Sequence, residues 1–175
     1  MKMAASLKSL LAITLIVFML PAAEQAFAQG QGGGRAKKEK KEKKANKSAD
    51  KLAKTAEKAE NQLGRDVVFC ILAAHTDVGT AEELRTKYNY LVAELGKFPF
   101  GQFVAAVIMA DRIGDEDFDL DEILAKLKEG LSIGKIAKEA DVNVGELRRG
   151  FGEFRSELAR SITNPPTKDC FATSP

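Results

Sequence analysis

Residues 99–114 read PFGQFVAAVIMADRIG, and this stretch decides the fold class. Proline suits the start of a helix and glycine suits the position after its end, so Pro99 and Gly114 frame a predicted helix through Arg112. One side of it is lined by Phe100, Phe103, Val104, Val107 and Ile108, and Ala105, Ala106, Met109 and Ala110 make most of the remainder apolar. A helix that is apolar on every side is buried. The sequence therefore predicts the middle helix of a bundle.

Helices are predicted on both sides of this segment, each from a capping residue, an apolar stripe and a terminating glycine or proline, over 67–74, 80–95, 119–129, 132–140 and 144–161. Residues 67–74 read VVFCILAA and are apolar all round, so we expect a second buried central element. No stretch alternates with period two for long. The fold class is therefore predicted to be all-α, a small multi-helix bundle.

Charge separates the rest of the chain into two regions, although the 175 residues carry a net charge of only +2. Gln29–Gly34, QGQGGG, is typical of a flexible tether. Arg35–Lys47 has eight basic and two acidic residues, a net of +6, whereas Ser48–Pro175 has 17 basic and 22 acidic residues, a net of −5. We interpret 29–47 as a flexible Gly-rich and Lys-rich arm, 48–163 as a helical domain and 164–175 as a tail.

The basic residues of this arm are the candidate binding residues, because blocks of like charge are solvated and often contact polyanions. They are Arg35, Lys37, Lys38, Lys40, Lys41, Lys43, Lys44 and Lys47. Candidate partners are anionic cell-envelope material (lipid head groups, lipopolysaccharide or teichoic acid), extracellular nucleic acid, another protein, or the acidic body itself. The other interpretation is a solubilising segment with no specific partner.

A further helix is expected over about 49–63, with the option of continuing backward through the Lys/Glu run. Ser48 suits its N-cap and Gly64 the position after its end. Its apolar residues follow a 4-3-4-3-4 spacing: Ala45, Ala49, Leu52, Ala56, Ala59 and Leu63. Because this seam is mostly alanine, it buries little area per residue. We therefore expect an exposed charged helix that leans on the body or pairs with another chain.

Residues 1–28 have the order of a secretory signal peptide. Lys2 and Lys8 precede an apolar run over 10–20, Pro21 breaks the run, and Ala26–Ala28 gives a small-x-small cleavage site. The eleven-residue run is shorter than the roughly 17–25 residues that span a bilayer. We expect cleavage after Ala28 and export to the periplasm or medium; an uncleaved membrane anchor is the other interpretation.

Export makes a disulfide the expected state of the two cysteines, Cys70 and Cys170. Such a bridge would close a loop of about a hundred residues and tie the tail to the core. The alternative is a buried structural thiol with a free thiol in the tail. The pair is not CxxC and has no adjacent base, which argues against catalytic redox chemistry.

No catalytic or cofactor motif stands out, and we expect a non-enzymatic protein with no metal and no cofactor. The patterns GxxxxGK[ST], GxGxxG and HExxH are absent from the sequence. Aligned from Asp115, an EF-hand loop would need Gly at Leu120 and Glu at Lys126, so the acidic run over 115–122 fits a helix start better. An enzyme with a site near His75, the one histidine, is a third hypothesis, because triads assemble in space.

Ser132–Arg149, SIGKIAKEADVNVGELRR, resembles the helix-turn-helix motif of bacterial regulators. The packing positions of that motif are matched by Ile136, Ala137, Ala140, Val142 and Leu147. Asp141 stands where the family usually has Gly in the turn. The resemblance implies a recognition helix from Asn143, with Arg148 and Arg149 as phosphate or base contacts. Export and an acidic body argue against chromosomal DNA as a partner.

Phe100–Gly145 also resembles small exported bacterial helical proteins of unestablished function, through FGQFV at 100–104, LKEG at 127–130 and IGKIAKE at 133–139. That resemblance implies export and a helical fold and implies no activity. The first hypothesis is therefore an exported, non-enzymatic helical protein that binds a ligand or serves as an envelope-associated accessory. The alternative is a helix-turn-helix DNA-binding protein retained in the cytoplasm.

Overall fold

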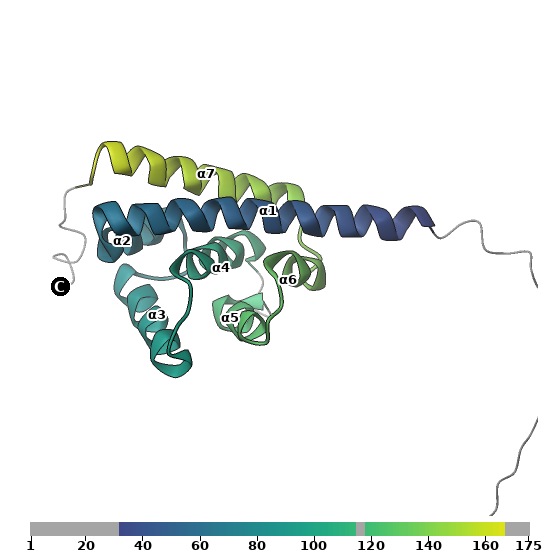
Figure 1. Cartoon of the computed structure of the whole chain (residues 1–175), viewed down its shortest axis with the longest axis horizontal. Coiled ribbons are helices and arrows are strands. Elements are labelled where there is room, and N and C mark those ends of the chain that lie inside the picture. The colour runs from purple at the N-terminus through teal and green to yellow at the C-terminus, as the bar shows by residue number, and fades with distance from the viewer. Residues whose placement is uncertain (1–31, 115–117, 167–175) are drawn as a thin grey trace, which may run out of the picture.

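The computed structural model describes residues 32–114 and 118–166, and this part of the chain is all-helical (Figure 1). Its helices are α1 (Gly32–Leu63), α2 (Arg65–His75), α3 (Ala81–Leu95), α4 (Phe100–Ile113), α5 (Leu120–Lys128), α6 (Ile133–Glu139) and α7 (Val144–Thr163). Within these two ranges there is no strand. The predicted all-α bundle is confirmed.

Helix α4 lies at the centre of the bundle, as its sequence predicts. Its buried residues are Phe100, Gly101 and the whole run Phe103–Ala110. Pro99 stands one position before the helix with φ −63°, and Gly114 ends it with φ 58°, in the left-handed region that glycine tolerates without strain. Because α4 is covered on every side, the remaining helices form a shell around it.

Helix α1 differs most from expectation. It begins at Gly32, so the Lys-rich segment predicted as a flexible arm is helical, in line with the backward continuation left open above. The expectation that this helix leans on the body is confirmed, because Ala45, Leu52, Ala56 and Ala59 are fully buried while its lysines from Lys40 to Lys58 are exposed. The seam of small side chains packs inside its own chain, which removes the need for a second copy to cover it.

The close approach that alanine and glycine permit explains the position of α1. A Cβ added to Gly101 of α4 would lie 2.5 Å from the backbone oxygen of Ala53 on α1. A Cβ on Gly134 of α6 would lie 2.6 Å from the backbone oxygen of Glu42. Helix backbones in such contact gain dispersion energy although each seam residue is small. An alanine seam therefore holds α1 firmly when glycines face it.

The helices form two groups (Figure 1). Helices α1 and α7 run side by side, and helices α2 to α6 lie below this pair in the view of Figure 1, with α2 and α4 in contact with both. Of all pairs of helices, α1 and α7 make the most extensive contact, and α1 also packs against α4, α6 and α2. In the view of Figure 1 the purple N-terminal part of α1 extends beyond the start of α7. The most basic part of the helix therefore projects from the body.

Helix α2 is less buried than its composition suggests. Val68, Phe69, Ile71 and Leu72 are buried, Cys70 is half-buried and Ala74 is exposed. Phe69 supplies much of the packing, with its ring 5.4 Å from Phe100 and 6.1 Å from Phe103, both edge-on. The prediction of a second central element was wrong because the small side chains on the outer face cost little to expose.

The helix ends confirm several local predictions. Thr80 and Glu83 form the complete capping box of α3, and Gly96 ends that helix with φ 67°. The side chain of Asp119 accepts a hydrogen bond from the backbone N–H of Glu122 at 2.9 Å, which caps α5. Ser132 caps α6 and is assisted by a distant residue: Asn46 of α1 accepts from the N–H of Gly134 at 2.7 Å and donates to the Ser132 hydroxyl at 3.2 Å.

Three predictions fall wholly or partly outside the described residues. They are the leader over 1–28 with its cleavage site, the tail beyond residue 166, and the Cys170 half of the disulfide. Among helices in the described ranges, none has both the length and the hydropathy required to cross a bilayer.

Candidate polyanion-binding surface

The predicted binding residues all lie on α1. Arg35, Lys37 and Lys38 belong to its first turns, and the side chains of Lys40, Lys41, Lys43, Lys44 and Lys47 are exposed. A helix fixes the directions of these charges, which a flexible arm would not. The ligand that these residues can bind therefore depends on which of them lie on the same face of α1.

Six lysines follow one line along the solvent side of α1, and we call them the lysine row: Lys40, Lys44, Lys47, Lys51, Lys54 and Lys58. Their spacing is 4-3-4-3-4, the spacing that keeps residues on one face of a helix. The buried seam at Ala45, Ala49, Leu52, Ala56 and Ala59 has the same spacing and lies on the opposite side. All six lysine side chains are exposed. Half of the row lies beyond the segment that its charge density singled out.

The lysine row is not neutralised by the body. None of its six side chains takes part in an ion pair or a side-chain hydrogen bond in the described structure. Some lysines of other helices do pair: Lys87 with Asp121 at 2.5 Å, and Lys126 with Glu139 at 3.0 Å. These carboxylates raise the pKa of Lys126, Glu139 having the larger effect and Glu122 adding to it. The row therefore has no internal counterion in the described ranges.

The acidic residues of α1 avoid the row. At 100° per residue, Glu39, Glu42, Asp50, Glu57 and Glu60 fall within an arc of about 80° on one flank of the helix. The other flank borders α7, where Nε of Arg148 donates to the hydroxyl of Ser48 at 3.3 Å. The row thus has an acidic margin on one side and a basic residue of α7 on the other.

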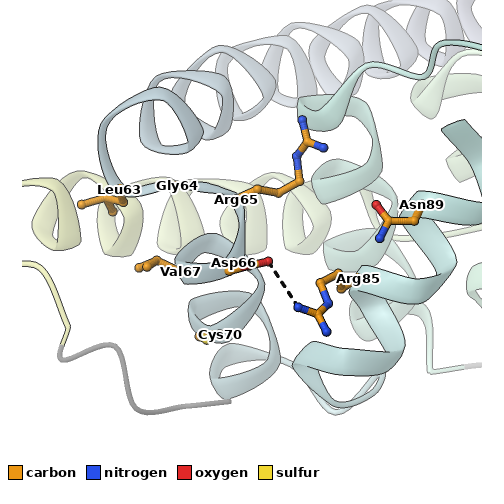
Figure 2. Close-up of a pocket in the computed structure, with 8 residues that line it drawn as sticks. All are labelled: Leu63, Gly64, Arg65, Asp66, Val67, Cys70, Arg85 and Asn89. Atoms are coloured by element: carbon orange, nitrogen blue, oxygen red, sulfur yellow. Dashed lines mark ion pairs between the residues drawn. The ribbon is translucent and has the colours of Figure 1, made fainter. Parts of the chain in front are cut away.

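A separate hollow of about 460 Å³ lies where α1, α2 and α3 meet (Figure 2). Arg65 and Arg85 line it, but carboxylates hold both: Arg65 pairs with Glu60, and Arg85 lies 3.8 Å from Asp66. The Arg65 guanidinium also stacks 4.8 Å from the centre of the Tyr88 ring. Burial raises the pKa of the Tyr88 hydroxyl, the charge of Arg65 opposes this rise, and the hydroxyl donates to the Phe98 carbonyl at 3.0 Å. These contacts describe a structural junction.

His75, the basis of the enzyme hypothesis, ends α2. Its ring packs 5.1 Å from the Phe154 ring, and its Nε2 atom is buried without a hydrogen-bond partner in the described structure. The hollow beside it, about 540 Å³ and widely open, is lined by Arg149, Ser156 and Glu157 among others. Across the described ranges, no three His, Cys, Asp or Glu side chains gather as metal ligands would. Among the described residues, no hydroxyl or thiol forms a hydrogen bond with Nε2 of His75.

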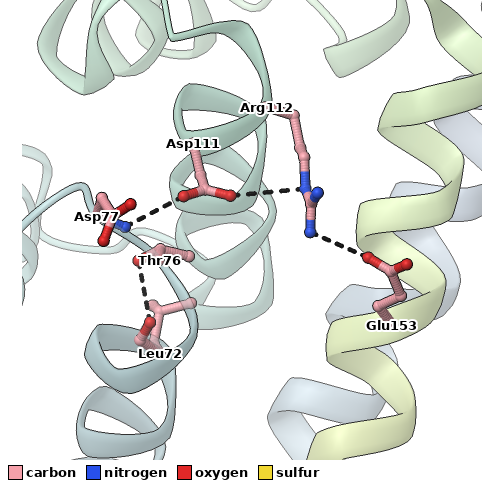
Figure 3. A network of polar contacts seen from close by, with 6 residues as sticks. All are labelled: Leu72, Thr76, Asp77, Asp111, Arg112 and Glu153. Atoms are coloured by element: carbon pink, nitrogen blue, oxygen red, sulfur yellow. Dashed lines mark hydrogen bonds and ion pairs between the residues drawn. The ribbon is translucent and has the colours of Figure 1, made fainter.

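A polar network that includes Thr76 and Asp77, which follow His75 in the sequence, connects three parts of the fold (Figure 3). Asp111 of α4 accepts from the N–H of Asp77 at 3.1 Å and lies 3.5 Å from Arg112. Arg112 in turn pairs with Glu153 of α7 at 3.0 Å. A Cβ on Gly150 would lie 2.7 Å from Nε of Arg112, so this glycine makes room for the arginine. The network holds α7 against the end of α4.

The segment that resembles a helix-turn-helix spans α6 and the start of α7. Ile136, Ala137 and Leu147 are fully buried, as that motif requires. Asp141 has φ 49°, the left-handed conformation that the family usually assigns to glycine. Arg149 is exposed, but Arg148 bonds to α1 and α7 lies beside α1 along the body (Figure 1). The segment therefore serves as packing against α1.

Comparison with protein-family models, with curated proteins and with solved structures found no match to this chain.

Sequence reasoning missed two features of this surface. Lys51, Lys54 and Lys58 were outside the candidate set because charge density, rather than helical spacing, defined it. The spacing itself is readable from the sequence once the helix is known to be continuous. The contact of Asn46 with Gly134 of α6 joins residues 88 positions apart in the sequence, and no local sequence pattern predicts it.

Proposed function

We propose that this chain is an exported, non-enzymatic helical protein that binds anionic material of the cell envelope through α1. The observation that carries this proposal is the lysine row: exposed positive charges, in line, with no counterion among the described residues. The predicted signal peptide supplies the location. In the hollow between α1, α2 and α3, Arg65 and Arg85 each lie against a carboxylate, and the His75 ring packs against Phe154.

The test measures binding of the purified mature protein to immobilised lipoteichoic acid and to lipopolysaccharide. The variant Lys40→Gln, Lys44→Gln, Lys47→Gln should lose most binding, because each lysine near an anionic surface contributes about 1 kcal/mol. Substitution is preferable to deletion of 35–47, since Ala45 and Asn46 are part of the packed body. Binding should also fall steeply with salt.

The matched control is Lys97→Gln, Lys135→Gln, Lys138→Gln, which removes the same charge from exposed lysines that have no ion pair in the described structure and lie outside α1. It should bind as the wild type does. Wild-type protein that binds neither polymer, or binding that salt leaves unchanged, would refute the proposal.

Export is tested separately, by mass spectrometry of the protein recovered from the cell. The expected amino terminus is Gln29. A cytosolic protein that retains Met1 would contradict the proposed binding to the cell envelope.

The second candidate function is DNA binding by Ser132–Arg149 in the cytoplasm. The left-handed Asp141 in the turn between α6 and α7 favours it. If it holds, Arg149→Ala should weaken binding to duplex DNA while the lysine-row variant binds normally. The opposite pattern supports the proposal made here.

A further inference from the structure

The shape of the lysine row bears on the shape of its ligand. A step of 18 residues separates Lys40 from Lys58, which is about 27 Å along a helix axis at 1.5 Å per residue. Six charges over that distance give one lysine per 5–6 Å on average. The row is straight, because α1 is a single uninterrupted helix (Figure 1). A ligand that meets all six lysines must therefore be long, narrow and evenly charged.

The row has no apolar element of its own. The residues beside its lysines, such as Thr55, are polar or acidic. The apolar residues of α1 face the body. Proteins that insert into a membrane surface place large apolar side chains beside their basic residues. Proteins that recognise nucleic-acid bases place aromatic rings there. The row offers ammonium groups alone, so it suits a ligand recognised only by its charges.

We infer that the ligand of the lysine row is a linear phosphodiester polymer, bound extended along α1 by its phosphates. In such a polymer, six backbone bonds separate one phosphate from the next. This repeat spans up to about 7 Å, twice the length that the three backbone bonds of a peptide residue span. Four such intervals cover about 27 Å, so five phosphates span the row. Lysine ammonium groups are mobile donors that accommodate the small mismatch between the two spacings. This inference rests on the proposed function and adds the form of its ligand.

The α7 side of the row supports the same geometry. Arg148 reaches the edge of α1 through its bond to Ser48, and Arg155 stands seven residues further along the same face of α7. Both side chains are exposed and have no ion pair among the described residues. A polymer strand on the row would therefore have basic residues along one side and the carboxylates of Glu39, Asp50 and Glu57 along the other. That asymmetry favours one strand over a broad surface.

The experiment titrates the mature protein with abasic phosphodiester oligomers of two to twelve phosphates and follows affinity by fluorescence anisotropy. Affinity should rise with length up to about five phosphates and then flatten. For the longest oligomer, the slope of log affinity against log salt should be about −3.5, from about five phosphate contacts at about 0.7 each on a single strand. The variant Lys51→Gln, Lys54→Gln, Lys58→Gln should reduce that slope to about −2 and move the plateau to two or three phosphates.

The Lys97, Lys135, Lys138 triple variant is again the control and should keep the wild-type plateau and slope. If the lysine-row variant and the control variant lost affinity equally, the row would not be the binding site, although the protein would still bind polyanions. Affinity that keeps rising beyond eight phosphates would lead to the same conclusion. Tight binding to phosphatidylglycerol vesicles, together with weak binding to the oligomers, would show that the ligand is a membrane surface and not a polymer. Absence of binding to every anionic probe would instead refute the proposed function.

Discussion

At the scale of single residues, glycines and one asparagine set the geometry of this bundle. Gly101 and Gly134 allow α4 and α6 to touch the backbone of α1, and Asn46 completes the cap of α6 from the same helix. All three lie where two helices meet. Their effect comes from the neighbour that each one faces, so it cannot be read from the local sequence.

Gly101→Ala tests this close approach. Helix propensity alone would stabilise the variant by about 1 kcal/mol, but the new Cβ meets three backbone atoms of Ala53 at 2.5–2.7 Å. Such overpacking costs about 1–3 kcal/mol and backbone atoms cannot move aside, so we expect a net loss of about 1–2 kcal/mol. Urea unfolding measures it. Gly152→Ala, on α7 with nothing within 4 Å, should instead gain stability. Similar changes in the two variants would contradict the packing described here.

Glu83 gives a pH-dependent contribution. Its carboxylate accepts from the N–H of Thr80 at 2.8 Å and from the Thr80 hydroxyl at 3.0 Å, and these bonds, the backbone one first, lower the pKa of Glu83. A carboxyl whose pKa is lower in the folded state stabilises the fold above its unfolded pKa. That stability is lost as the pH falls through the folded pKa. Glu83→Gln should therefore be less stable than wild type at neutral pH, with the difference shrinking below about pH 4.

Denaturant titrations at several pH values measure this difference. Glu82→Gln is the control, because Glu82 pairs with Arg85 outside the capping box. A gap between wild type and Glu83→Gln that stays constant from pH 7 to pH 3 would show that the box does not depend on the charge.

At the scale of elements, local sequence rules predicted the helices correctly. They did not predict the role of α1. Thr80 with Glu83, and the glycines at 96 and 114, fix helix ends through interactions within four residues, which a sequence displays. The alanine seam of α1 has no such signal. Small apolar residues at heptad spacing suit a solvated helix and a buried one equally. Only the glycines that face the seam from α4 and α6 decide between them.

Ala56→Leu tests whether α1 belongs to the core. Ala56 is fully buried, and three extra heavy atoms at a helix interface should cost about 1–3 kcal/mol. Ala159→Leu, on the exposed face of α7, should change stability by less than about 0.5 kcal/mol. Thermal or urea unfolding compares the two. If α1 were a peripheral charged helix, the two variants would behave alike.

At the scale of the whole molecule, the candidate surface was half predicted. The density of lysines over 35–47 located its beginning, and Lys51, Lys54 and Lys58 were missed because they are interspersed with acidic and neutral residues. Their alignment follows from the continuity of α1, which in turn follows from its packing against α7 and α4. A surface of this kind is a property of the assembled fold rather than of a motif.

The predicted disulfide also belongs to this scale. Cys70 is half-buried on α2, and Cys170 lies outside the described residues. We expect the mature protein, purified without reductant, to be lighter by two hydrogen atoms than after reduction. In the chain-entropy model a bridge across about a hundred residues contributes about 4–5 kcal/mol, so Cys70→Ser with Cys170→Ser should lower the unfolding midpoint strongly. Equal masses before and after reduction would show that the two thiols are free.

The extensive pairing of α1 with α7 has a consequence for biosynthesis. Among the described helices, α1 leaves the ribosome first and finds its main neighbour only when α7 has been made, about a hundred residues later. Until then α1 lacks its most extensive contact, although α4 and α6, which face its alanine seam, have already been made. The pairing of α1 with α7 therefore forms last, after the helices that lie between them in the sequence have been made.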